Sequence, residues 1–178
     1  MKNVARLYNQ FQPEHYDVAL VPDRTAMTFG GRVTITGKKT GRPSQRMTLH
    51  GKGLQVQSAT LVKHDKKGDQ PVVISRTNLQ KSYDEIRLHS DVMLYAGNYT
   101  ITLEFTGAIH QTMHGIYPCN YTVDGTKKSL IATQFESHHA REAFPCIDEP
   151  EAKATFQLHL TTPADEVALS NTPVAEES

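Results

Sequence analysis

The fold class is decided by residues 97–107, which read Gly97-Asn98-Tyr99-Thr100-Ile101-Thr102-Leu103-Glu104-Phe105-Thr106-Gly107. Polar residues separate four apolar ones between the terminal glycines, and this period of two is typical of a β-strand with one buried face. We predict a strand here, with Tyr99, Ile101, Leu103 and Phe105 on the face that meets the core.

Similar alternation on both sides of this stretch predicts further strands. Clear candidates are residues 16–21, 29–36, 130–136, 155–160 and 167–169, and shorter ones are 47–50, 54–57 and 59–63. Gly30-Gly31 would form a β-bulge inside the second of these. Because no window of helical length keeps a period of 3.6, we predict an all-β sandwich of about ten strands, mostly antiparallel.

Length and charge restrict the classes of protein to consider. The chain has 178 residues, which is enough for one domain with a real core. Basic and acidic residues number 19 each, so the totals give no electrostatic footprint for nucleic acid or a membrane surface. The sequence contains neither an apolar run of signal-peptide length nor the roughly 20 apolar residues of a membrane span. We expect a soluble, cytoplasmic protein.

Chemistry-bearing residues concentrate in residues 133–150, which read Thr-Gln-Phe-Glu-Ser-His-His-Ala-Arg-Glu-Ala-Phe-Pro-Cys-Ile-Asp-Glu-Pro. In an extended chain, residues two apart share a face, so Gln134 and Glu136 would stand side by side while Phe135 turns into the core. From these residues alone, an ordinary polar strand end is the simpler interpretation of the pair. Residues 140–143 would then make one helical turn, which Pro145 ends.

No metal-ligand pattern is visible in the chain. A zinc hydrolase of the His-Glu-x-x-His type would need that sequence on a helix, and it is absent. His138 and His139 are adjacent, so their side chains should diverge, and His110, His114 and Glu136 could meet only through tertiary folding. We therefore expect no metal ligands in this chain.

No nucleophile stands out either. Cys146 follows Phe144-Pro145 in an apolar setting, which should raise the pKa of its thiol and keep it unreactive. Asp148 and Glu149 are neighbours whose side chains seldom converge, so capping or ion pairing is a better interpretation than paired acid–base catalysis. We expect no catalytic residue in this chain.

Many short motifs occur in an order that points to one family. The first group is Thr133-Gln134-Phe135-Glu136, Ala140-Arg141, Phe144-Pro145-Cys146, Asp148-Glu149-Pro150 and Lys153-Ala154-Thr155-Phe156. The second is His15-Tyr16-Asp17, Phe29-Gly30-Gly31, Leu49-His50 with Leu54, Gly97-Asn98-Tyr99, Phe105-Thr106-Gly107, Gly115-Ile116-Tyr117 and Leu169-Ser170-Asn171. Over about residues 13–173 the chain resembles the N-terminal domain of the aminopeptidase N family of zinc metallopeptidases.

The resemblance implies a saddle-shaped β-sandwich spanning residues 1–178, with an ordered core of about 13–173, placed before a thermolysin-like catalytic domain. That second domain would carry the zinc and the Gly-x-Met-Glu-Asn motif, so this chain alone should not hydrolyse peptides. By the same resemblance, Glu136 binds the free α-ammonium group of a peptide substrate, and Gln134 lines the pocket for its first side chain. The implied partners are the N-terminus of the peptide and the catalytic domain.

The chain departs from the family pattern in two places. Thr172 stands where methionine is common before Pro173, and His138-His139 fills a variable stretch. An alternative function remains, a free-standing β-sandwich interaction module without a catalytic role. The two functions differ in whether the reading frame continues past Ser178 into a zinc motif.

Overall fold

The computed structural model describes residues 6–66 and 68–177, and the regular secondary structure in this part of the chain is almost entirely β-strand. The strands are β1 Phe11–Asp23, β2 Thr28–Lys39, β3 Ser44–His50, β4 Gln55–Asp65, β5 Gly68–Val72, β6 Ile74–Gln80, β7 Glu85–Leu94, β8 Gly97–Ala108, β9 Gly115–Val123, β10 Thr126–Gln134 and β11 Thr155–Leu160. Three short 3₁₀ turns accompany them, η1 Leu7–Asn9, η2 Lys81–Tyr83 and η3 Ala140–Glu142.

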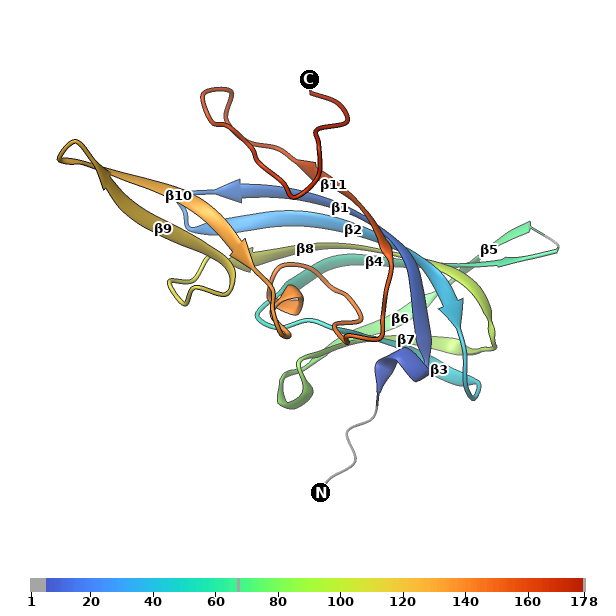
Figure 1. Ribbon diagram of the computed structural model, residues 1–178. Coiled ribbons are helices and arrows are strands. Elements are labelled where there is room, and N and C mark those ends of the chain that lie inside the picture. Colours follow the sequence, from blue (N-terminus) through green and yellow to red (C-terminus); the bar gives the residue numbers. More distant parts are fainter. Residues whose placement is uncertain (1–5, 67, 178) are drawn as a thin grey trace.

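The strands form two facing sheets and a separate hairpin. The larger sheet has the order β11-β1-β2-β8-β4-β5, the smaller has the order β3-β7-β6, and β9 pairs only with β10. Every pair is antiparallel except β1 with β11. The larger sheet curves over the smaller one, and the hairpin projects to one side (Figure 1). The predicted all-β, mostly antiparallel sandwich is confirmed.

The core lies between the two sheets, and β8 stands near its centre. Tyr99, Ile101, Leu103 and Phe105 are each at most 2% exposed, as their alternation predicts. They belong to one buried apolar cluster that takes in residues of both sheets, for example Val33 and Ile35 of β2, Leu49 of β3, and Ile86 and Leu88 of β7. Each such side chain contributes about 1.5–3 kcal/mol when it leaves water, so this cluster is the main source of stability.

Three local predictions are wrong. Residues 54–57 and 59–63 do not form two strands, because β4 runs through both and absorbs the irregularity as a register shift between Val56 and Ser58. Gly30-Gly31 is no bulge, since its pairing with β1 is continuous. Gly31 serves close packing instead, because a Cβ there would lie 2.6 Å from the Phe105 ring. Residues 167–169 are not a strand, and Val167 and Leu169 are more than 80% exposed.

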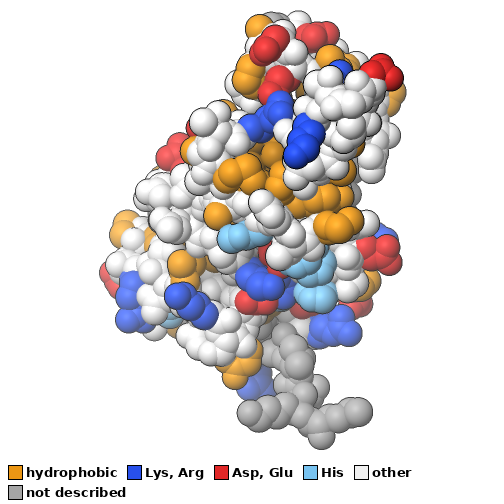
Figure 2. Space-filling view, turned by 90° about the vertical axis from the view of Figure 1, so that its left-hand side faces the viewer, with side chains coloured by type: hydrophobic (Ala, Val, Ile, Leu, Met, Phe, Trp, Pro, Cys, Tyr) orange, Lys and Arg blue, Asp and Glu red, His pale blue; other side chains and the backbone are white. Residues whose placement is uncertain are grey.

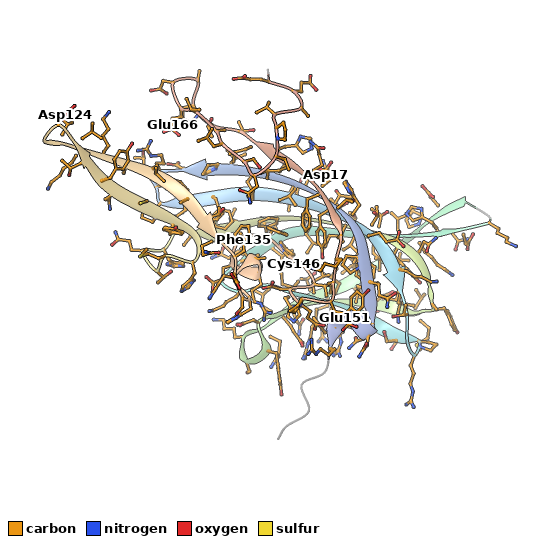
Figure 3. The ribbon with its side chains drawn as sticks, in the orientation of Figure 1. Asp17, Asp124, Phe135, Cys146, Glu151 and Glu166 are labelled. Atoms are coloured by element: carbon orange, nitrogen blue, oxygen red, sulfur yellow. The ribbon has the colours of Figure 1, made fainter. Side chains whose placement is uncertain are left out.

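The β9–β10 hairpin is longer than the sequence pattern indicates. The predicted strand at 130–136 begins earlier and ends earlier, at Thr126 and Gln134, and its partner β9 is not predicted at all. Pro118 and several polar residues interrupt the alternation of β9, whose outer half is exposed. The two-residue turn Asp124-Gly125 has positive φ at both positions, the geometry that Asp-Gly favours in tight hairpins. Figure 3 labels Asp124 at the tip of the hairpin.

The described residues also bear on the expected absence of a membrane span. Among residues 6–66 and 68–177, no helix has the length and apolar character needed to cross a bilayer.

Candidate functional site

Gln134 and Glu136 lie where β10 ends and the chain turns toward η3. Both side chains are exposed, and the backbone N–H of Glu136 donates to Oε1 of Gln134 at 3.1 Å. The strand stops at Gln134, so the two residues do not share a strand face, and this hydrogen bond ties the Gln134 side chain to the backbone of Glu136. The peptide bond after Glu136 is cis. Both residues are exposed at the surface.

Phe135 points away from this pair and anchors the turn. Its half-buried ring meets Phe144 edge to face with centroids 6.0 Å apart, and Phe144 in turn meets Tyr16 of β1. Figure 3 shows Phe135 at the inner end of the hairpin, on the side where Cys146 lies. The predicted orientation of Phe135 is confirmed. Aromatic contacts of this kind contribute about 0.5–1.5 kcal/mol beyond their burial, so they hold the turn against the core.

The residues after η3 fasten the same turn to the sheets. Arg141 Nε donates to Oδ2 of Asp148 at 2.9 Å, and both side chains are less than 15% exposed. The N–H of His50 donates to the Cys146 carbonyl at 2.7 Å, and the Cys146 N–H donates back at 3.1 Å. Glu149 accepts a hydrogen bond from the Leu7 N–H at 2.8 Å. The expectation that Asp148 and Glu149 serve pairing and capping is confirmed.

The buried groups beside this turn are held neutral. Burial, reinforced by the nearby Asp148 carboxylate, raises the pKa of the Cys146 thiol well above its ordinary value. Burial likewise raises the pKa of Tyr16, whose hydroxyl accepts a hydrogen bond from the Ile147 N–H at 3.0 Å. Cys146 is therefore unreactive, as its apolar setting predicts. The other cysteine, Cys119, is a free thiol exposed on β9.

His50 gives a testable pH dependence. Burial is the main cause that lowers the pKa of His50 to about 4, and the nearby Arg141 charge also lowers it. The Asp148 carboxylate opposes this shift. Its Nδ1 accepts a hydrogen bond from the Asp148 N–H at 3.0 Å, which requires the neutral ring. Between about pH 6.5 and pH 4 the unfolded chain therefore binds a proton that the folded chain refuses. We expect this residue to reduce the free energy of unfolding by about 3 kcal/mol as the pH falls through that window.

Urea unfolding of wild type and His50→Gln at pH 7, 5.5 and 4 measures this contribution. The variant should lose less stability than wild type over that range, because glutamine keeps an acceptor but has no proton to gain. His159→Gln, which replaces an exposed histidine on β11, serves as the matched control and should follow wild type. Parallel curves for wild type and His50→Gln would contradict the assignment.

A second polar cluster lies beside the candidate site and was not predicted. The Nδ1 atom of His114 lies 2.6 Å from Oε2 of Glu142, and the Nδ1 atom of His139 lies 3.2 Å from Oε1. Lys52 Nζ donates to Oε1 of the same carboxylate at 2.9 Å. His138 stacks on His139 at 4.6 Å, so the expectation that these rings diverge is wrong. Tertiary folding brings His114 to Glu142, and no hydrogen bond or ion pair joins it to Glu136 among the described residues.

The Glu142 carboxylate is the centre of this cluster. Its partial burial alone would raise its pKa, but hydrogen bonds from Lys52, His139 and His114 outweigh that effect and lower the pKa to about 2. Glu142 is therefore ionised under ordinary conditions. The sequence carries no local signal for the cluster, because its members are up to 90 residues apart.

Comparisons with known proteins were consistent with one another. A family model described as the Peptidase M1 N-terminal domain matches residues 12–178. Aminopeptidase N of Lactococcus lactis subsp. lactis is 42% identical over 175 residues, which are 96% of this chain and 19% of that protein. Aminopeptidase N of Lactobacillus helveticus is 39% identical over 175 residues, which are 97% of this chain and 19% of that protein. Aminopeptidase M1-A of Oryza sativa subsp. japonica is 34% identical over 173 residues, which are 97% of this chain and 20% of that protein. The chain spans about a fifth of the length of these relatives.

Proposed function

Because this chain belongs to the family of Peptidase M1 N-terminal domains, we propose that it anchors the N-terminus of a peptide substrate within a larger aminopeptidase. In this proposal Glu136 binds the free α-ammonium group of the peptide, and Gln134 lines the pocket for the first side chain. Neither residue makes or breaks a bond.

The observation that carries the proposal is the availability of the Glu136 carboxylate. It is exposed, and within the described part of the chain no basic side chain pairs with it. Glu142 and Asp148 differ in this respect, since each is engaged by a cation of this chain. The backbone under Glu136 is held by Gln134 and by the packing of Phe135. A carboxylate that stands on an anchored backbone and pairs with no cation of the described chain is suited to receive an external cation.

The chemistry of an aminopeptidase explains why such a carboxylate is useful. A charge-assisted hydrogen bond to an ammonium group favours a chain with a free terminal amine over an internal amide or a blocked end. Fixing the amine also fixes how far the first peptide carbonyl reaches toward the reacting groups. In the family that the sequence resembles, zinc in a following domain would polarise that carbonyl and activate water. Glu136 would thus set both the selectivity and the register of the substrate.

Exposed apolar side chains support a role within a larger protein. Leu130 on β10, and Phe156, Leu158 and Leu160 on β11, are 39–59% exposed. Figure 2, which faces the side of the hairpin, shows apolar side chains gathered over this region. We propose that the catalytic domain covers part of this surface. Apolar patches rimmed by polar residues are typical of such interfaces.

The proposal is tested by comparing this chain with the same chain joined to a catalytic domain. Both would be given an aminoacyl 4-nitroanilide and its N-acetylated counterpart. We expect hydrolysis only by the joined protein, and far faster hydrolysis of the free-amine substrate than of the acetylated one. Hydrolysis by the 178-residue chain, or equal cleavage of the acetylated substrate, would contradict the proposal. A native reading frame that ends without a catalytic domain would favour the interaction module instead.

A further inference from the structure

We propose that His114, His139 and Glu142 bind a divalent transition-metal ion of the zinc type. One ligand atom from each residue can be chosen so that all three lie within 4.8 Å of one another, and each residue is partly buried. Two imidazoles and a carboxylate are a ligand set that zinc accepts, with a further position left for water. This site does not depend on the proposed role of Glu136.

The backbone brings the three side chains together closely. His114 ends the loop between β8 and β9, whereas His139 and Glu142 lie at η3. Gly115 has φ of 65°, and a Cβ there would lie 3.0 Å from the Cβ of Glu142, so a glycine lets the loop approach. The rings of His114 and His139 stack with centroids 4.1 Å apart and planes inclined by 21°. Both rings therefore direct the same nitrogen, Nδ1, toward one carboxylate.

Coordination requires some rearrangement of the three ligand atoms, which lie within 4.8 Å of one another. In a tetrahedral zinc site, ligand atoms stand about 3.3–3.6 Å apart, given bonds of about 2.0–2.2 Å. The His139 Nδ1 to Glu142 Oε1 distance of 3.2 Å is already close to that range. The His114 Nδ1 to Oε2 distance of 2.6 Å must lengthen by less than 1 Å. Because His114 and Glu142 come from different segments, a shift of the loop before β9 can supply this movement.

The protons of the cluster identify what the ion would replace. A carboxylate accepts hydrogen bonds, so each Nδ1 that donates to a Glu142 oxygen in the metal-free protein carries a proton. Coordination needs the Nδ1 lone pair, so that proton moves to Nε2 or leaves. The ion would then bind His114, His139 and Glu142 together, in place of the hydrogen bonds between them.

Lys52 is the internal competitor for this site. Its ammonium group donates to Glu142 Oε1 at 2.9 Å and supplies the positive charge that the ion would bring. The Lys52 side chain is 47% exposed, so it can swing into solvent when the ion binds. Removing this ammonium group should therefore strengthen metal binding.

A cavity of about 210 Å³ adjoins the cluster and leaves space for the remaining ligands. His114 and Glu142 line it together with Lys52, His110, Thr112 and Ile116. Water molecules, or His110 after a loop movement, would complete the coordination sphere. Figure 2 shows histidine side chains grouped with acidic and basic ones on this face, so an ion could enter from solvent.

Isothermal titration of the tag-free 178-residue chain with ZnCl₂ tests the site. We expect about one equivalent to bind with a dissociation constant of about 10 µM or lower. His114→Gln and His139→Gln should each weaken binding by at least about tenfold. His138→Gln is the matched control, because this histidine is adjacent to His139 but outside the ligand set, and it should change the affinity less than twofold. Circular dichroism verifies that each variant is folded.

Lys52→Met gives a test in the opposite direction, since we expect it to tighten Zn²⁺ binding by about threefold or more. A Co²⁺ titration adds a spectroscopic signature, because tetrahedral coordination gives visible absorption that weak surface binding does not. The proposal is overturned if wild type does not bind Zn²⁺ in this range. It is equally overturned if His138→Gln weakens binding as much as His139→Gln, or if Lys52→Met weakens it.

Discussion

In the larger aminopeptidase proposed above, replacing Glu136 by alanine is expected to lower kcat/KM on a free-amine aminoacyl substrate by about 100-fold or more, while leaving the slow reaction on the N-acetylated substrate nearly unchanged. A hundredfold change corresponds to about 3 kcal/mol of lost transition-state binding, which is the size expected for a hydrogen bond between charged groups shielded from water. The acetylated substrate has no ammonium group, so it has no such contact to lose.

Because Glu136 is exposed, this experiment should report on substrate binding and not on a loss of stability. Its carboxylate pairs with no basic side chain in the described part of the chain, so alanine should leave stability nearly intact. Glu151→Ala, which removes another exposed carboxylate, is the matched control and should keep wild-type activity. Figure 3 shows Glu151 well away from Phe135 and the end of the hairpin. Wild-type activity of Glu136→Ala would mean that the anchor is another residue.

The Gln134→Ala variant tests how the Glu136 carboxylate is positioned. Because Gln134 Oε1 accepts the Glu136 N–H, Gln134→Ala removes a hydrogen bond that positions the carboxylate. The expected loss is about 1 kcal/mol, or roughly fivefold in kcat/KM. In the double variant the two losses should add only in part, since positioning Glu136 has no value once its carboxylate is gone, whereas a contact of Gln134 with the first side chain would still be lost. Full additivity would indicate that Gln134 does not position Glu136.

The second large effect is expected on stability, from Asp148→Ala in the 178-residue chain. Asp148 is the partner of Arg141, and both side chains are less than 15% exposed. Removing one partner of such a pair leaves a poorly hydrated charge, which costs about 3–5 kcal/mol. We therefore expect the midpoint of urea unfolding to fall sharply. The loss should be larger than that of a typical surface substitution by several fold.

Asp17→Ala is the appropriate control for this measurement. Asp17 also pairs with a basic residue, His159, but both side chains are about half exposed. Exposed pairs of this kind contribute about 0–1 kcal/mol, so the control should unfold close to wild type. If the two variants lose equal stability, the Arg141–Asp148 pair does not have the structural importance assigned to it.

The sequence predicted the features that depend on residues near one another in the chain. It did not predict those that depend on a distant partner. The alternation of residues 97–107 predicted the central strand and its buried face, because one side of a strand in a sandwich must leave water. Residues 167–169 look similar over three positions, but they pair with no strand and stay exposed. A short apolar run therefore predicts a strand only when the fold offers a neighbour. The Asp124-Gly125 turn was the local signal that would have located the hairpin.

The candidate site shows the same limit. The positions of Gln134 and Glu136 and the burial of Phe135 followed from their order along one short segment. The meeting of Lys52, His114 and Glu142 did not, because three separate segments supply it. Adjacent residues are also poorly predicted when tertiary packing decides their rotamers, as the stacking of His138 on His139 shows.

The parallel pairing of β1 with β11 has a consequence for folding during synthesis on the ribosome. β1 gains β2 as a neighbour early, but its other edge is paired only by residues 155–160, about 140 positions later. Until those residues emerge from the exit tunnel, a long strand keeps an unpaired edge, which invites association with other chains. The nascent chain therefore completes its larger sheet only after residues 155–160 have been made.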